Sequence, residues 1–223
     1  IIEHDKTKVK LFDELPDGHM GFPGNLKVKT TYKVDKSTID IFIEASTDKT
    51  TLCNFTNHSY FNLDGTKNIA NHNLIVNCEN VLPVDKNGIP LSKPVSAKEL
   101  SLEFKNSRKL NDDGKPTEID HNFCISNTRQ NLSTNAILST KNISLELLST
   151  EPGLQIYTGK GLNSGNDKGW GGHSYKAFAG IALEPQIWPD SPNQVGFPNP
   201  YLSPNEKYKH HTRIKFSDSN NKK

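Results

Sequence analysis

The stretch Ile39-Asp40-Ile41-Phe42-Ile43-Glu44-Ala45 places apolar residues at alternate positions, with two carboxylates between them. A period of two residues predicts a β-strand with one buried face. The preceding segment, 26–34, alternates in the same way. Turn pairs such as Asp64-Gly65 and Asn87-Gly88 punctuate the rest of the chain. Between such turns we expect further strands at residues 74–76, 137–139, 144–148, 154–158, 181–183 and 213–216.

Helical periodicity is nearly absent from the sequence. No window shows apolar residues recurring every three to four positions over several turns. The best helix candidate is the short segment 96–102, which opens with Ser96 in the N-cap position. Many short strands joined by Gly, Pro and Asn turns are typical of an all-β sandwich or barrel. Because the 223 residues contain no repeat and no linker, we predict one domain spanning 1–223.

The composition argues against several classes of partner. The 27 basic and 25 acidic residues leave a net charge of +2, so we expect no nucleic acid and no membrane as partners. Only three arginines occur, fewer than a phosphate clamp usually needs. No run of 18 apolar residues and no signal peptide are visible. Cys53, Cys78 and Cys124 lack the spacing of a metal site, so we expect reduced thiols in a cytoplasmic protein without a bound metal.

Three stretches mix hydrogen-bonding side chains with aromatic rings. They are Thr56-Asn57-His58-Ser59-Tyr60-Phe61-Asn62-Leu63, Ile119-Asp120-His121-Asn122-Phe123 and Ala182-Leu183-Glu184-Pro185-Gln186-Ile187-Trp188-Pro189-Asp190. Sugars bind to such mixtures, because their hydroxyls need donors and acceptors while the C–H face of a pyranose packs on a ring. The sequence therefore indicates a carbohydrate site.

Each stretch also has a structural interpretation. A lone histidine such as His58 is more often hydrogen-bonded scaffold than a catalyst. Glu184 follows a short apolar run, where a carboxylate is either paired structurally or functional. Asp120 is also a residue type that caps turns, so the alternative of a purely structural role stays open for it.

Taken together, the blocks resemble the aldose 1-epimerase family, and they follow the family's order over residues 18–216. The similar blocks are Gly21-Phe22-Pro23-Gly24-Asn25-Leu26, Asn57-His58-Ser59-Tyr60-Phe61-Asn62-Leu63, Leu82-Pro83-Val84 with Gly88-Ile89-Pro90, Asp120-His121-Asn122-Phe123, Pro152-Gly153-Leu154-Gln155-Ile156-Tyr157-Thr158-Gly159 and Leu183-Glu184-Pro185-Gln186-Ile187-Trp188-Pro189-Asp190. The resemblance implies a large twisted antiparallel β-sandwich of the galactose mutarotase type. It also implies substrate-binding side chains at Asp120 and Gln155, with Ser59 and Tyr60 lining the pocket.

The same resemblance places the family's general acid on His58 and its general base on Glu184. Such a pair interconverts the α and β anomers of an aldose such as galactose or glucose. A cyclic hemiacetal opens when its anomeric hydroxyl loses a proton while its ring oxygen gains one, and reclosure after rotation gives the other anomer. A positioned acid or base contributes about 100- to 10,000-fold to such a step. The chemistry needs no cofactor, and the expected partner is a small-molecule aldose.

The chain also departs from the family pattern. The family carries a His-Gly-Gly stretch and an Asn-Arg pair before its Gly-Phe-Pro-Gly block, and the 20 residues before Gly21 contain neither. We therefore expect a sequence that lacks the N-terminal third of the family, and a fused or associated sugar-nucleotide epimerase domain stays open. Lys160 replaces an asparagine after Thr158-Gly159. The alternatives are a non-catalytic carbohydrate-binding sandwich and a hexose-6-phosphate 1-epimerase, which the scarcity of arginine disfavours.

Two other features have simple interpretations. Neighbouring residues on a strand point to opposite faces, so His210 and His211 are not expected to bind one metal ion. The run Gly169-Trp170-Gly171-Gly172-His173 is typical of a flexible loop. We favour this interpretation over one in which the loop lies beside the sugar.

Overall fold

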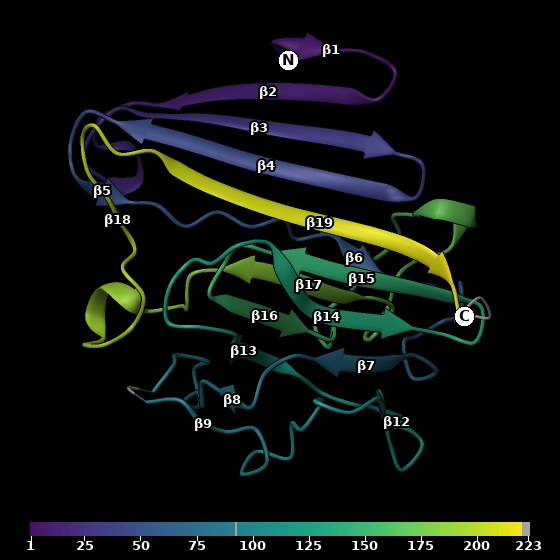
Figure 1. The fold of residues 1–223 in the computed structure, drawn as a ribbon. Helices are drawn as coiled ribbons and strands as arrows, with labels where there is room; N and C mark the ends of the chain where they lie inside the picture. The colour runs from purple at the N-terminus through teal and green to yellow at the C-terminus, as the bar shows by residue number, and fades with distance from the viewer. Residues whose placement is uncertain (92, 220–223) are drawn as a thin grey trace.

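Two antiparallel sheets make up most of the fold in the computed structural model, which describes residues 1–91 and 93–219. Within these residues the larger sheet has nine strands. Their order is β1 (Glu3–His4), β2 (Lys8–Leu15), β3 (Leu26–Asp35), β4 (Thr38–Thr47), β19 (Tyr208–Asp218), β15 (Ile143–Ser149), β14 (Ser133–Ser139), β7 (Asn73–Val76) and β10 (Arg108–Lys109). Figure 1 shows the long strands β2, β3, β4 and β19 side by side in this layer.

The smaller sheet forms the second layer and has six strands among the described residues. Their order is β6 (Tyr60–Phe61), β17 (Ile181–Gln186), β16 (Gly153–Tyr157), β13 (Asp120–Cys124), β8 (Asn80–Val81) and β9 (Val95–Ser96). Short pairs and 3₁₀ turns complete the described part of the chain. They are β11 (Asn111–Asp112) with β12 (Lys115–Pro116), β5 (Thr51–Leu52) with β18 (Tyr201–Leu202), η1 (His19–Gly21), η2 (Trp170–Gly172) and η3 (Ser191–Asn193). The prediction of an all-β, antiparallel fold is confirmed.

The hydrophobic core lies between the two sheets, because each strand turns alternate side chains inward. Leu138 and Leu145 of the larger sheet belong to the same buried cluster as Phe123, Leu154 and Ile156 of the smaller one. Burying apolar area of this kind contributes roughly 25 cal/mol per Å². The opposite face of the smaller sheet is therefore free to carry polar side chains.

The strand predictions agree with the structure, but the predicted helix at 96–102 is wrong. Ser96 ends strand β9, and the following residues form turns closed by a bond from the Leu102 amide to the Ala97 carbonyl, 2.8 Å long. Ser101 adopts a left-handed φ of 56°, which a continuing right-handed helix does not allow. Ala97 and Leu102 are both buried, so the packing of these two side chains, rather than the weak helix propensity, determines the conformation of this segment.

Candidate active site

The two side chains expected to transfer protons meet at the β6–β17 end of the smaller sheet. Strand pairing sets Tyr60 opposite Ala182, so the chain just before β6 runs past the middle of β17. There the Nε2 atom of His58 lies 3.5 Å from the Oε1 atom of Glu184. The carboxylate is sunk into the sheet, with 9% of its side chain exposed, whereas the imidazole is 52% exposed. A buried carboxylate thus faces an accessible imidazole.

Burial changes the acidity of this carboxyl group. Loss of solvent is the largest effect and raises the pKa of Glu184 above its ordinary value. The nearby His58 opposes this effect and lowers the pKa, while the negative charge of Asp120 raises it further. A carboxyl whose pKa is displaced toward neutrality is a better proton acceptor at physiological pH than an exposed one.

Gln155 lies on β16, the neighbour of β17, and Asp120 lies on β13, the neighbour of β16. Gln155 in β16 pairs directly with Glu184, and Asp120 begins β13, where it pairs with Tyr157. The Gln155 Nε2 atom donates a 2.8 Å hydrogen bond to the Asp120 Oδ1 atom. The turn-cap alternative for Asp120 is therefore wrong, because this residue belongs to a strand. Four neighbouring elements bring the acid, the base and this amide–carboxylate pair onto one face.

Ser59 and Tyr60 stand at the open side of this group, and both are exposed. The Tyr60 ring lies 5.1 Å from the His58 ring between centroids and 6.2 Å from that of Tyr157. The Ser59 amide donates a 3.2 Å bond to the Asn57 Oδ1 atom, and Ser59 itself is exposed. Aromatic faces and exchangeable hydroxyls thus border the His58–Glu184 pair.

Comparisons with known proteins show which family the chain belongs to. Residues 1–215 match the sequence model of the family described as aldose 1-epimerase. The chain belongs to the aldose 1-epimerase family. It is 37% identical over 215 residues to galactose mutarotase of Mus musculus, covering 94% of this chain and 63% of that protein. It is 33% identical over 229 residues to aldose 1-epimerase of Escherichia coli, covering 97% of this chain and 66% of the relative. The chain thus spans just under two thirds of these relatives.

Solved structures show the same fold. The GalM/aldose epimerase homologue of C. elegans aligns with a TM-score of 0.88 at 27% identity, over 97% of this chain and 67% of the other. Galactose 1-epimerase of Lactobacillus acidophilus aligns with a TM-score of 0.78 at 29% identity, over 97% and 65%. The expected galactose mutarotase fold is therefore confirmed for this aldose 1-epimerase family member.

Tyr157 is a residue on this face that the sequence reasoning missed. Its hydroxyl accepts a 2.6 Å bond from the Gly161 amide, which ties the loop after β16 to the edge of the cluster. The spacing contained a signal, because Tyr157 is two residues after Gln155 and a strand returns to the same face every second residue. Asn122, two residues after Asp120, is on this face for the same reason and is buried.

The adjacent histidines behave as expected for a strand. His210 is buried, with its Nδ1 atom 3.1 Å from the Phe55 carbonyl oxygen, whereas the Nε2 atom of His211 lies 2.6 Å from Asp40 Oδ1. Within residues 1–91 and 93–219, no group of three or more His, Cys, Asp or Glu side chains is placed to hold a metal ion. No helix in that same part of the chain is long and apolar enough to cross a membrane.

Other features of the sequence make contacts of their own. Lys160 forms a 2.6 Å ion pair with Glu118. The glycine-rich run 169–173 contains η2, but the side chain of Trp170 lies outside the described residues. All three cysteines are free thiols, and burial raises the pKa of Cys53 to about 12, as expected for an unreactive thiol.

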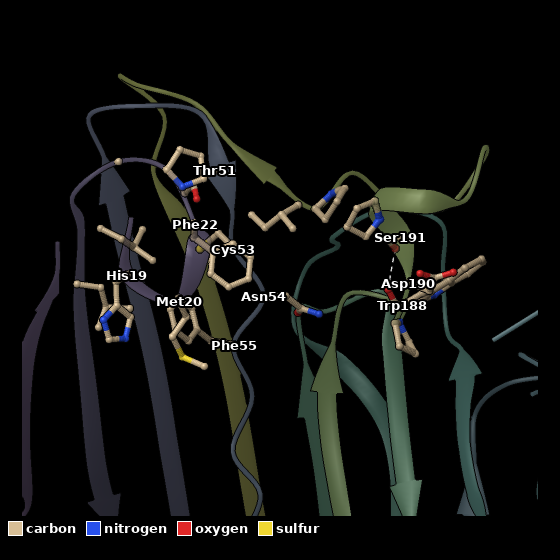
Figure 2. A pocket seen from close by; sticks show the side chains of 18 of the residues that line it. His19, Met20, Phe22, Thr51, Cys53, Asn54, Phe55, Trp188, Asp190 and Ser191 are labelled. Atoms are coloured by element: carbon tan, nitrogen blue, oxygen red, sulfur yellow. Dashed lines mark hydrogen bonds between the residues drawn. The ribbon is translucent and has the colours of Figure 1, made fainter. Parts of the chain in front are cut away.

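A separate hollow of about 360 Å³ opens between η1 and the chain that follows β17. Figure 2 shows Met20 and Phe22 on one side and Trp188 and Ser191 on the other, with Asn54 between them. None of the acid, base or sugar-binding candidates lines it. Because its walls are mostly aromatic, aliphatic and proline side chains, it offers fewer partners for hydroxyl groups than the polar face of the smaller sheet.

Proposed function

We propose that this chain catalyses the interconversion of the α and β anomers of free aldoses, as an aldose 1-epimerase. The observation that carries the proposal is the 3.5 Å approach of His58 Nε2 to Glu184 Oε1. Ring opening needs a base at the anomeric hydroxyl and an acid at the ring oxygen. Both oxygens are bonded to the same carbon, so an acid and a base this close together can reach both.

In the proposed mechanism Glu184, as carboxylate, removes the proton from the anomeric hydroxyl. His58, as imidazolium, gives a proton to the ring oxygen while the carbon–oxygen bond of the ring breaks. The open aldehyde rotates about its first carbon–carbon bond, and reclosure reverses both transfers. Each group ends the cycle in its starting protonation state, so the reaction consumes nothing but the sugar.

Binding is assigned to the side chains beside this pair. We propose that Asp120 and Gln155 bind sugar hydroxyls, because their amide–carboxylate bond leaves further donor and acceptor atoms for a ligand. Tyr60 offers a ring for the C–H face of a pyranose, and Ser59 offers a hydroxyl at the rim. Galactose and glucose are the proposed substrates; galactose is the sugar for which the mutarotases of Mus musculus and Bos taurus are named.

The distribution of arginine argues against a sugar phosphate as substrate. Each of the three arginines is paired with a carboxylate outside the proposed site: Arg108 with Asp112, Arg129 with Glu151 and Arg213 with Asp40. A phosphate would need at least one unengaged cation nearby. A non-catalytic binding domain would need the aromatic rim but no adjacent acid and base, so the His58–Glu184 approach favours an enzyme.

Two broader proposals accompany this function. Both sheets contribute to one buried cluster, which supports treating residues 1–223 as a single domain. The three free thiols support a cytoplasmic location, because reducing compartments keep cysteines unpaired.

Polarimetry on freshly dissolved α-galactose tests the function directly. We expect the chain to accelerate mutarotation, and we expect His58→Ala or Glu184→Ala to lower the rate at least about 100-fold, the lower end for loss of a general acid or base. Lys160→Ala is the matched control, because it removes an exposed ion pair and should leave the rate unchanged. Near-normal rates in either site variant, or no catalysis by the unmodified chain, would contradict the proposal.

A further inference from the structure

The segment that carries His58 belongs to no strand, yet it is attached to neighbouring elements by hydrogen bonds. Residues 53–59 lie between β5 and β6 without ladder pairing. The Phe55 amide donates a 3.2 Å bond to the Tyr208 hydroxyl, and its carbonyl oxygen lies 3.1 Å from His210 Nδ1, so this residue is held to β19. Because the segment lacks a ladder, the side chains that bind it determine where His58 lies.

Asn54 attaches this segment to the far end of the strand that carries the base. Its Nδ2 atom donates a 3.1 Å bond to the Ile187 carbonyl, and the Ile187 amide donates a 2.9 Å bond to its Oδ1 atom. This double exchange imitates a hydrogen-bonded pair of an antiparallel ladder. Ile187 directly follows Gln186, the last residue of β17. In Figure 2, Asn54 stands between the η1 side of the hollow and the chain at Trp188.

Asn62 makes the corresponding attachment at the near end of the same strand. Its Nδ2 atom donates 2.9 Å bonds to the carbonyls of Ala179 and Thr66, and its Oδ1 atom accepts a 3.1 Å bond from the Gly65 amide. Ala179 lies two residues before Ile181, where β17 begins. Asn54 therefore fixes the start of the His58 segment to one end of β17, and Asn62, just beyond β6, fixes the chain that follows the segment to the other end; Glu184 sits within that strand.

We propose that Asn54 and Asn62 are positioning residues that hold His58 beside Glu184. The assignment rests on the proposed function of that pair. Neither asparagine is assigned a proton, and both act through the backbone that carries the imidazole. With both ends fixed to the strand of the base, the acid and the base share one frame. Loosening either end frees the imidazole to move, and a misplacement of 1 Å can lower a rate about 100-fold.

The position of His58 has a readout at Glu184 that does not depend on turnover. The groups that act electrostatically on this carboxyl or share its surroundings are His58, Tyr60 of β6, Tyr157 of β16 and Asp120 of β13. Of the two charge effects acting on it, only that of His58 lowers its pKa. If the imidazole moves away, the pKa of Glu184 must rise, and the acid limb of the pH–rate profile must move to higher pH.

The experiment compares Asn54→Ala and Asn62→Ala with Asn135→Ala. Asn135 is buried in β14, and its Oδ1 atom accepts a 3.0 Å bond from the Ser149 amide, so its loss costs stability without touching the His58 segment. Because Asn54 itself is exposed, water can replace its bonds and Asn54→Ala should fold. The measurements are kcat and KM by polarimetry, and the Glu184 titration by NMR with ¹³C-labelled glutamate, assigned with Glu184→Gln.

We expect both Asn54→Ala and Asn62→Ala to lower kcat at least about tenfold with little change in KM, and to shift the Glu184 titration to higher pH. Asn135→Ala should leave both readouts unchanged even though it is the more destabilised protein. If both Asn54→Ala and Asn62→Ala match Asn135→Ala in kcat and in the titration of Glu184, the proposal is overturned. If the unmodified chain shows no mutarotation, the proposed function fails, and the NMR titration alone still decides whether these asparagines position His58.

Discussion

The pair formed by Arg129 and Glu151 gives a sharp prediction about stability, because its two members differ in exposure. The Nε atom of Arg129 lies 2.8 Å from Glu151 Oε1, and the guanidinium stacks 4.3 Å above the centre of the Tyr208 ring. The Glu151 side chain is 0% exposed, and its Oε2 atom has no hydrogen-bond partner in the structure, whereas the arginine is 33% exposed. The carboxylate therefore depends on this arginine far more than the arginine depends on it.

The expected magnitudes follow from that asymmetry. Arg129→Met keeps a side chain over Tyr208 but leaves a buried carboxylate unpaired, which costs about 3–5 kcal/mol. Glu151→Gln keeps an acceptor for Arg129, whose guanidinium reaches water, so we expect about 1–2 kcal/mol. For a chain of this length, 1 kcal/mol corresponds to a shift of about 2–4 °C in Tm. Arg129→Met should thus lower Tm by about 6–20 °C and Glu151→Gln by about 2–8 °C.

Equilibrium urea unfolding followed by circular dichroism measures the change in the free energy of unfolding for each variant, and thermal unfolding measures the change in Tm. The double variant Arg129→Met with Glu151→Gln serves as the internal control, because it buries no unpaired charge. It should be more stable than Arg129→Met alone, giving a favourable interaction energy in the double-mutant cycle. The reasoning is refuted if Arg129→Met costs no more than Glu151→Gln, or if the double variant is the least stable of the three.

Three further predictions concern the candidate site. Asp120→Asn should raise KM for galactose by about tenfold or more, the loss of a charge-assisted hydrogen bond, while both limbs of the pH–rate profile persist; a missing limb would assign Asp120 a proton-transfer role instead. Burial raises the pKa of Glu184 above its ordinary value, so the native state binds the carboxyl proton more tightly than the unfolded chain does. The free energy of unfolding therefore falls as pH rises from the ordinary pKa of a glutamate to the raised pKa of Glu184. Glu184→Gln should remove this loss, and urea unfolding at acidic and mildly alkaline pH should show a flatter dependence than wild type. Gly153→Ala should cost about 1–3 kcal/mol, because a methyl group there would sit 2.5 Å from Asn122 Oδ1 and 2.8 Å from Trp188 Cδ1; unchanged urea unfolding would show that these neighbours move away freely.

Much of the fold was predictable from alternation, because the core lies between sheets with one buried face each. The alternating stretch 39–45 lies within β4, where Ile41 and Ile43 are buried. Phe42 occupies an outward position yet stacks on His211 with ring centroids 4.2 Å apart, which explains an aromatic residue where a polar one is typical. Strand β2, with Lys8, Lys10, Asp13 and Glu14, was missed because charged residues dilute its pattern.

The candidate site was only partly predictable. The motifs pointed to His58, Glu184, Asp120 and Gln155, but no local pattern reveals that β6, β17, β16 and β13 are neighbours in that order. That order depends on long-range pairing, such as the alignment of Gln155 with Glu184 across the β16–β17 ladder. The attachment of the His58 segment was also invisible in the sequence, because an asparagine that bonds a distant backbone looks like any turn residue.

The acid and the base of the proposed pair sit on chain segments of different mechanical character. Glu184 belongs to a strand that pairs with β16 along its length and with β6 at its start, whereas His58 belongs to an unpaired stretch that is fixed by side chains. Local opening should therefore be frequent around the imidazole and rare around the carboxylate, which amide hydrogen exchange can resolve residue by residue. The proton donor is thus held in place by a few side-chain hydrogen bonds, and the proton acceptor by a backbone ladder. Substitutions outside the pair should therefore displace the proton donor far more readily than the proton acceptor.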